Sequence, residues 1–178
     1  MKITETSLPG VKIIEPQVFG DSRGWFFESF SEQSLNLGAI FVQDNHSYSA
    51  QRGTLRGLHF QQNPHAQIKI VRCTRGRILD VTVDIRKGSP NYRQWVAVEL
   101  SAENFRQLLI PAGFAHGFLA LADDVEIQYK ASEYYDPESD RSIKWDDPTI
   151  GVEWGIAEPI LSGKDRNAPY LDESDCNF

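Results

Sequence analysis

The sequence predicts an all-β domain, either a sandwich or a closed barrel of short antiparallel strands. About ten strand-like runs follow one another at a spacing of roughly 8–12 residues, with turn-forming residues between them. Aromatic residues, which favour strands, make up 11% of the 178 residues. No stretch alternates strands with helices in the way that a parallel sheet requires.

The first half of the chain contains strands and one short helix. A strand is predicted over residues 11–14, and another over 25–30, after the turn signal at Asp21-Ser22-Arg23-Gly24. Ser31 is a suitable N-cap for a helix that runs to Leu37 and ends at Gly38. Further strands are predicted over 41–48, 54–61 and 67–74.

The second half continues the same pattern until about residue 138. Ile78–Ile85 alternates well, with four aliphatic side chains from Leu79 to Ile85 on one face and Asp80, Thr82 and Asp84 on the other. A helical turn is predicted over 101–104, and strands over 94–100, 107–110, 117–122 and 125–131. The last ~40 residues lack this periodicity, so we expect loops and short helices packed on the barrel. Residues 1–178 are therefore expected to form a single domain.

Composition excludes several classes of protein. The 18 basic and 25 acidic residues give a net charge of −7, which disfavours nucleic-acid binding. No apolar run is long enough to span a membrane, and the first twenty residues have no secretory signal, so a cytoplasmic protein is expected. Cys73 and Cys176 are expected to be free thiols, too few for a disulfide scaffold or a four-cysteine zinc site.

Signatures of nucleotide hydrolysis, dinucleotide binding, serine hydrolysis and HExxH metalloproteases are absent from the chain. The histidines also form an incomplete metal motif. His59 has neither a second histidine two residues later nor a following Glu, which leaves His116 as the only other plausible ligand. We therefore expect no metal and no organic cofactor.

Two polar side chains, Arg56 and His59, lie three residues apart in an otherwise apolar strand. Strict alternation would place Arg56 and His59 on opposite faces, so a bend at Gly57 is needed if both serve one pocket. The alternative from spacing alone is a surface arginine and a structural histidine. Lys69 similarly either shares an inward face with Val71 or projects into solvent from an edge strand.

Other polar residues also fall on apolar faces. Tyr129 alternates with Val125 and Ile127 and should point inward, as a site residue or as a core tyrosine. His116 shares a face with Phe118 and Ala120. Glu28 lies between Phe26 and Phe30, with Arg23 upstream as its candidate partner or as a substrate ligand.

These side chains are of complementary kinds. Histidine can act as a general base near neutral pH, and tyrosine can act as an acid. Lysine and arginine can stabilise an oxyanion or bind phosphate. Such a set suits proton abstraction next to a carbonyl group, and spacing alone takes the interpretation no further.

Several segments are more specific than their single residues. They are Asp21–Phe30, Gln43–Asn45, Arg56–Gln61, Pro111–Phe118, Tyr129-Lys130 with Tyr134-Tyr135, Ile143–Pro148 and Ser162–Asp165. In this order they resemble the dTDP-4-dehydrorhamnose 3,5-epimerase family, from about residue 3 to residue 172. The resemblance implies a cupin-type β jelly roll with short peripheral helices, a homodimer and catalysis without a metal. It also implies epimerisation of dTDP-4-dehydro-6-deoxy-D-glucose at C3 and C5, which flank the C4 ketone, in dTDP-L-rhamnose synthesis.

The resemblance assigns roles to individual residues. His59 is the expected base, Asp165 its dyad partner, Tyr129 the acid on the opposite face, and Lys69 the stabiliser of the C4 oxyanion. Substrate contacts are expected from Arg23, Glu28, Gln43, Asp44, Asn45, Arg56, His116, Tyr135, Asp140 and Lys164. Tyr135 would stack on thymine. Asp140 stands where many relatives carry Glu, so its reach is shorter and its contact less firmly implied.

Two other functions share this sequence pattern. One is an enzyme that inverts only C3 of a related dTDP-4-keto-6-deoxy sugar. The other is a non-catalytic cupin that binds a nucleotide sugar, against which the complete acid, base and dyad set argues.

Overall fold

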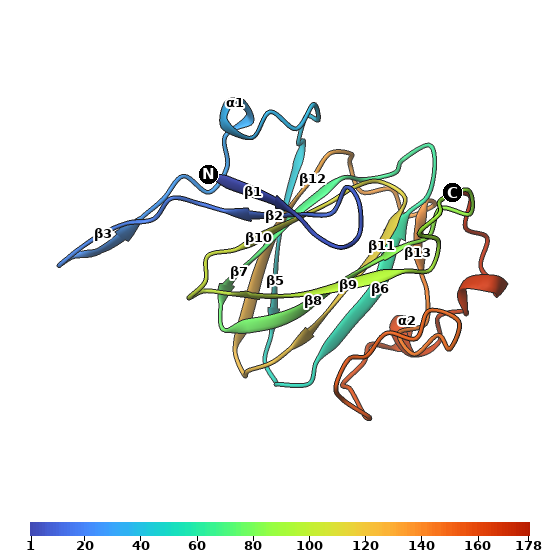
Figure 1. Cartoon of the computed structure of the whole chain (residues 1–178). Coiled ribbons are helices and arrows are strands. Elements are labelled where there is room, and N and C mark those ends of the chain that lie inside the picture. The colour runs from blue at the N-terminus through green and yellow to red at the C-terminus, as the bar shows by residue number, and fades with distance from the viewer.

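The computed structural model describes residues 1–178 and consists mainly of two antiparallel sheets packed face to face (Figure 1). The six-stranded sheet has the order β1 (Lys2–Glu5), β2 (Lys12–Glu15), β10 (Gln107–Ile110), β7 (Lys69–Arg75), β12 (Val125–Ala131) and β5 (Gln43–Ser49). The five-stranded sheet has the order β13 (Asp140–Ser142), β6 (Leu55–Gln61), β11 (Phe114–Ala120), β8 (Arg77–Asp84) and β9 (Trp95–Ser101). The predicted all-β jelly-roll fold is confirmed.

The remaining elements are short and lie outside the two sheets. Strands β3 (Phe19–Asp21) and β4 (Gly24–Phe26) form a separate hairpin. The helices are α1 (Glu32–Leu35), α2 (Gly163–Arg166) and the 3₁₀ helix η1 (Leu171–Glu173). No helix is long and apolar enough to cross a membrane.

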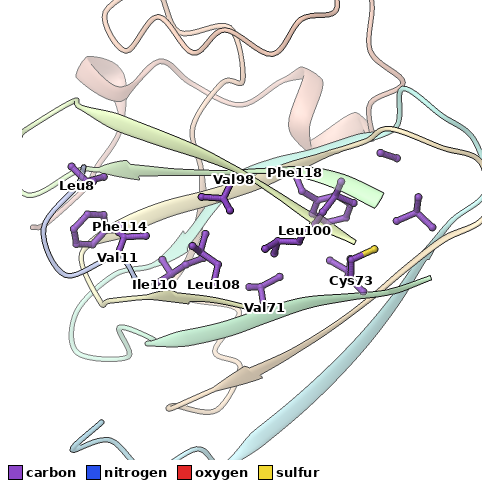
Figure 2. Close-up of a cluster of buried hydrophobic side chains, with 14 residues drawn as sticks. Leu8, Val11, Val71, Cys73, Val98, Leu100, Leu108, Ile110, Phe114 and Phe118 are labelled. Atoms are coloured by element: carbon purple, nitrogen blue, oxygen red, sulfur yellow. The ribbon is translucent and has the colours of Figure 1, made fainter. Parts of the chain in front are cut away.

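The main core lies between the two sheets (Figure 2). Val71 and Ile127 from the six-stranded sheet meet Leu100 and Phe118 from the five-stranded sheet, and all four are buried. Each such side chain contributes about 1.5–3 kcal/mol when removed from water. This packing fixes which face of every strand points inward, and therefore also fixes the direction of the polar residues that alternate with the core.

A second core covers the outer face of the five-stranded sheet. Val81 and Val83 pack there with Trp154 and Leu171 from the C-terminal segment. The strand that alternates so clearly in the sequence is therefore buried on both faces, and its polar positions Asp80 and Thr82 are fully buried.

The hairpin of β3 and β4 projects from the body of the molecule as an arm (Figure 1). Its large side chains Phe19, Trp25 and Phe26 are 57%, 62% and 70% exposed. Only the base of the arm is anchored. Trp25 and Phe27 pack against each other with tilted rings, and both meet the ring of Phe105 edge-on. An arm with this much uncovered aromatic surface is unusual on a monomer.

Several predicted boundaries were wrong. The helix capped by Ser31 ends at Leu35, because Asn36 adopts the left-handed conformation (φ 43°) that terminates a helix, so Gly38 is not its end. The strand predicted over 25–30 is confined to β4, and β11 starts at Phe114. The helical turn predicted over 101–104 is a turn over residues 102–104, because Ser101 still belongs to β9, and the Phe105 N–H closes it on the Ser101 carbonyl at 3.2 Å. Strands β1, β3 and β13 were not predicted, since each has only three or four residues and is defined by its partner strand.

Candidate active site

A cavity of about 230 Å³ opens between the two sheets beside the main core. His59 and His116 line it from the five-stranded sheet, and Lys69 and Tyr129 line it from the six-stranded sheet. The other lining residues are Ser47, Arg56, Phe118, Ile127, Ser162 and Asp165. Histidine and tyrosine therefore come from facing sheets, so a substrate in the cavity has one on each side.

A bend at Gly57 brings Arg56 and His59 to the same cavity, as the sequence required. On β11, His116 pairs with His59 and Phe118 pairs with Arg56, with a shift in register between the two pairs. Gly57 has φ +130°, and a Cβ atom there would lie 2.5 Å from the Cα of Gly117. Only glycine fits this close approach of two strands.

Asp165 reaches His59 from a segment more than one hundred residues further along the chain. The Leu55 N–H donates to the Ile160 carbonyl at 3.0 Å and the Ile160 N–H donates to the Gly53 carbonyl at 2.8 Å, which attaches this segment to the start of β6. Helix α2 follows directly, and the Asp165 Oδ1 atom lies 2.5 Å from Nε2 of His59. Asp165 is 2% exposed, whereas the His59 side chain keeps 32% of its surface accessible to the cavity.

The electrostatics of the dyad favour a charged carboxylate. Burial raises the pKa of Asp165, but the hydrogen bond and charge of His59, with further bonds from Ser162 and the Gly57 backbone, hold the pKa below its usual value. A carboxylate that stays ionised beside an imidazole stabilises the protonated ring. The pair can therefore accept a proton from a bound molecule.

Lys69 and Tyr129 occupy the opposite wall, with the Lys69 Nζ atom 5.9 Å from the centre of the Tyr129 ring. Burial lowers the pKa of Lys69 from 10.5 to about 8, while the negative charges of Asp140 and Asp80 oppose that change. Burial raises the pKa of Tyr129, as does the charge of Asp140, so the phenol keeps its proton. This wall therefore offers a proton donor beside a cation that is poorly solvated.

His116 is held by a buried carboxylate that the sequence analysis did not select. Its Nε2 atom lies 2.9 Å from Oδ2 of Asp80, and burial raises the pKa of that carboxyl group. Asp80 carried a detectable signal, because it alternates with aliphatic residues on a strand that pairs with the His116 strand. Ser162 was part of a sequence motif without a role of its own. Phe118 and Ile127 were placed on the faces of His116 and Tyr129 by alternation but were not selected as cavity residues, and no signal pointed to Ser47.

Five predicted binding residues lie outside the cavity lining but are connected to each other. Gln43 donates from Nε2 to Asn45 Oδ1 at 3.0 Å and accepts the Tyr135 N–H at 2.9 Å. Lys164 and the Tyr135 hydroxyl both reach Oδ2 of Asp140, at 2.5 and 3.4 Å. Asn45 pairs with the cavity residue Tyr129 across β5 and β12, which places this polar cluster next to the cavity.

Three predicted binding residues are not brought to this cavity. Asp44 lies beside Lys130, whose Nζ donates to its carboxylate at 2.9 Å. Arg23 is on the arm and pairs with Asp21. Glu28 accepts a hydrogen bond from the Ser34 hydroxyl at 2.9 Å, so of the two alternatives for Arg23 the structure removes the pairing with Glu28 and leaves the substrate contact.

Metal ligands are not grouped anywhere in the protein, since no three His, Cys, Asp or Glu side chains converge. Each of the two histidines at the cavity is instead paired with one carboxylate, His59 with Asp165 and His116 with Asp80. The donor set therefore does not resemble a metal site of the three-ligand kind.

Comparison with known proteins decides the family. A family model described as dTDP-4-dehydrorhamnose 3,5-epimerase matches residues 5–173. The chain belongs to this family. The dTDP-4-dehydrorhamnose 3,5-epimerase of Salmonella typhimurium is 53% identical over 179 residues, which cover 98% of this chain and 97% of that protein.

Solved structures agree with the sequence relatives. The Bacillus anthracis enzyme of the same name, crystallised with TDP and PPi bound, is 49% identical with a TM-score of 0.92, covering 95% of this chain and 98% of that one. The Legionella pneumophila 3,5-epimerase in complex with dTDP-4-keto-L-rhamnose is 46% identical, also with a TM-score of 0.92, covering 98% and 94%. A 3'-monoepimerase from Streptomyces bikiniensis in complex with dTDP-quinovose is less similar, at 37% identity and a TM-score of 0.88, covering 94% and 86%.

Proposed function

We propose that this protein converts dTDP-4-dehydro-6-deoxy-D-glucose into dTDP-4-dehydro-L-rhamnose by inverting C3 and C5, in dTDP-L-rhamnose synthesis. The observation that carries the proposal is the opposition of an imidazole–carboxylate pair and a tyrosine across one cavity. Inversion needs proton removal on one face of a carbon and proton return on the other. Simple binding of a nucleotide sugar needs no such pair.

Each step uses a group already in position. His59 removes the proton from C3 or C5, and the charge of Asp165 stabilises the imidazolium that results. The electrons move into the C4 carbonyl, and the protonated Lys69 stabilises the enolate oxygen. Tyr129 then donates its proton to the opposite face of the carbon. Before the next inversion the His59 imidazolium releases a proton to solvent and the Tyr129 phenolate takes one up. The same residues serve both carbons because both are adjacent to C4, and neither metal nor organic cofactor takes part.

The nucleotide part of the substrate is assigned to the groups around the cavity. Arg56 and His116 line the cavity itself and suit the sugar and diphosphate oxygens. Asn45, Gln43 and Lys164 extend polar contacts away from it. Tyr135 is 58% exposed and free to stack on thymine. Asp140 accepts hydrogen bonds from Lys164 and from the Tyr135 hydroxyl, so we propose that it orients these two side chains. We also assign it a contact with substrate.

A homodimer accounts for the residues of the arm. Arg23 is at the turn of the projecting hairpin with its side chain 88% exposed, and it contacts only its neighbour Asp21. Exposed Phe19, Trp25 and Phe26 give the arm an apolar surface that a second copy can cover. We propose that the arm of each subunit carries Arg23 to the partner's cavity, and that the segment just beyond the base of the arm presents Glu28 there. We further propose that residues 1–178 fold as a single domain. We also propose that the protein is cytoplasmic.

The dimer is tested by mass and by mixing. Light scattering should give about twice 20.2 kDa. Co-expression of R23A with H59A should restore activity, because one cavity of the mixed dimer then has His59 and receives Arg23. A monomer at micromolar concentration, or a mixed dimer no more active than either variant, would contradict the exchanged arm.

The division between base and acid is tested by solvent exchange in deuterated water. H59A should lose both deuterium incorporation and epimerisation by at least about 10²–10⁴-fold, because no enolate forms. Y129F keeps the base, so incorporation should continue while inverted product falls. Equal loss of exchange in both variants would contradict the two roles, and near-native exchange in H59A would contradict the base itself.

A further inference from the structure

Asp165 is held by a serine in an arrangement that differs from an ordinary helix cap. The Ser162 hydroxyl accepts the Asp165 N–H at 3.0 Å, as an N-cap does, and it also donates to Oδ2 of the same carboxylate at 2.9 Å. The other oxygen, Oδ1, faces His59 at 2.5 Å. Each carboxylate oxygen therefore has a separate side-chain partner, in addition to the bond from the Gly57 backbone.

The sequence Ser162-Gly163-Lys164-Asp165 has the spacing of a capping box. In a capping box the acidic side chain at the third helical position bends back to the backbone N–H of the cap residue. Here the Ser162 backbone N–H makes no such bond, and the carboxylate contacts the serine hydroxyl and the imidazole. The acidic residue has been diverted from capping the helix to pairing with His59.

We infer that Ser162 is a positioning residue that sets the orientation and basicity of the His59–Asp165 pair. This inference rests on the proposed role of His59 as the base. No proton passes through Ser162; its hydroxyl proton stays on Oγ and withdraws electron density from the carboxylate. Ser162 also lines the cavity, and Arg56, Lys69, His116 and Tyr129 are the other charged or titratable groups that line it with His59 and Asp165.

The sign of the effect follows from the hydrogen bond. Removing the donor leaves the Asp165 carboxylate with more negative charge to offer to His59, which stabilises the imidazolium. A base that holds its proton more tightly is available only at higher pH. A hydrogen bond to a charged group is worth enough to move a titration by about one pH unit. S162A should therefore shift the acidic limb of kcat/KM upward by about one unit, and lower kcat about tenfold through looser orientation of the ring.

The chain offers a matched control for the capping contribution. Ser31 caps α1, which has four residues like α2, and accepts the Ser34 N–H at 3.1 Å without touching the cavity. S31A and S162A should lose similar stability, because both remove one N-cap oxygen. Only S162A should change the pH profile. S162T keeps a hydroxyl in place and should restore the native limb, and S162G, which costs a cap only a little, should reproduce the shift with the fold retained.

The deciding measurement is a titration of His59 by NMR in the wild type and in these four variants, beside the pH dependence of kcat/KM. We expect the His59 titration and the acidic limb to move upward together in S162A and S162G and to stay at the wild-type position in S162T and S31A. Unchanged profiles in S162A and S162G would overturn the inference and leave Ser162 as a cap alone. The NMR titration needs no turnover, so failure of His59 as the base would appear separately, as activity insensitive to H59A.

Discussion

Lys69 should destabilise the folded protein while serving the reaction, and its replacement by methionine separates the two effects. A pKa of about 8 in place of 10.5 means that folding brings the charged ammonium into a less favourable environment. At about 1.4 kcal/mol per pKa unit, the cost is about 3 kcal/mol. Lys69 keeps part of its surface in contact with the cavity, and water there reduces the cost to about 1–2 kcal/mol.

The sign and the pH window follow from these two pKa values. Below about pH 8 Lys69 is charged in both the folded and the unfolded state, so the cost is present in full. Between about pH 8 and 10.5 the unfolded chain binds more protons than the folded one, so stability rises with pH. K69M should therefore be more stable than the wild type by about 1–2 kcal/mol at pH 7, and this advantage should shrink towards pH 10.5.

Urea unfolding at pH 7 and pH 10 measures both predictions. K87M is the control, because Lys87 is exposed and its replacement should change stability by no more than about 0.5 kcal/mol. In the same preparations K69M should lose about 10²–10³-fold in kcat, as expected when a group that stabilises an oxyanion is removed. A variant less stable than the wild type at pH 7, or with a difference independent of pH, would refute the reasoning.

Three further outcomes are expected. The activity of the wild type should fall at alkaline pH with a midpoint near pH 8, because Lys69 loses its proton there. K69R should move this alkaline limb to higher pH because arginine stays charged. Both results are read from the dependence of kcat on pH. Y135A should weaken binding of both substrate and free dTDP in calorimetry, and unchanged dTDP affinity would remove the stacking assignment. Prolonged chelation should leave activity intact, whereas a loss restored by one specific metal would contradict catalysis without a metal.

Alternation along the strands indicated which side of the sheet the site residues occupy, because each lies on the same face of its strand as a residue of the core. Lys69 alternates with Val71, and Tyr129 alternates with Ile127, and both aliphatic partners lie in the main core. A period of two therefore favoured an inward Tyr129 but left Lys69 open between the core face and solvent. The structure removes the edge-strand alternative for Lys69, because β7 lies between β10 and β12. The bend at Gly57 was also accessible, because no regular strand can place side chains three residues apart on one face.

Other parts of the site had no local signal. The contact of Asp165 with His59 depends on how residues 53–55 pair with Ile160, which is a tertiary contact between segments of different character. Asp80 resembled the solvent-facing half of an amphipathic strand, but the C-terminal segment covers the apolar half and leaves Asp80 inside. The second strand of the arm was predicted to continue to Phe30 because its aromatic residues favour strands, although Trp25 and Phe26 are exposed in this chain.

Incubation of the wild-type enzyme with dTDP-4-dehydro-6-deoxy-D-glucose in deuterated water tests the central claim most directly. The proposed mechanism has an opposed base and acid next to a C4 ketone, so every inversion should exchange a carbon-bound proton for one from solvent-equilibrated groups. NMR of the product should find deuterium at both C3 and C5 together with the L-rhamno configuration. Deuterium at C3 alone would identify a C3-specific epimerase, and the absence of deuterium at both carbons would contradict epimerisation altogether.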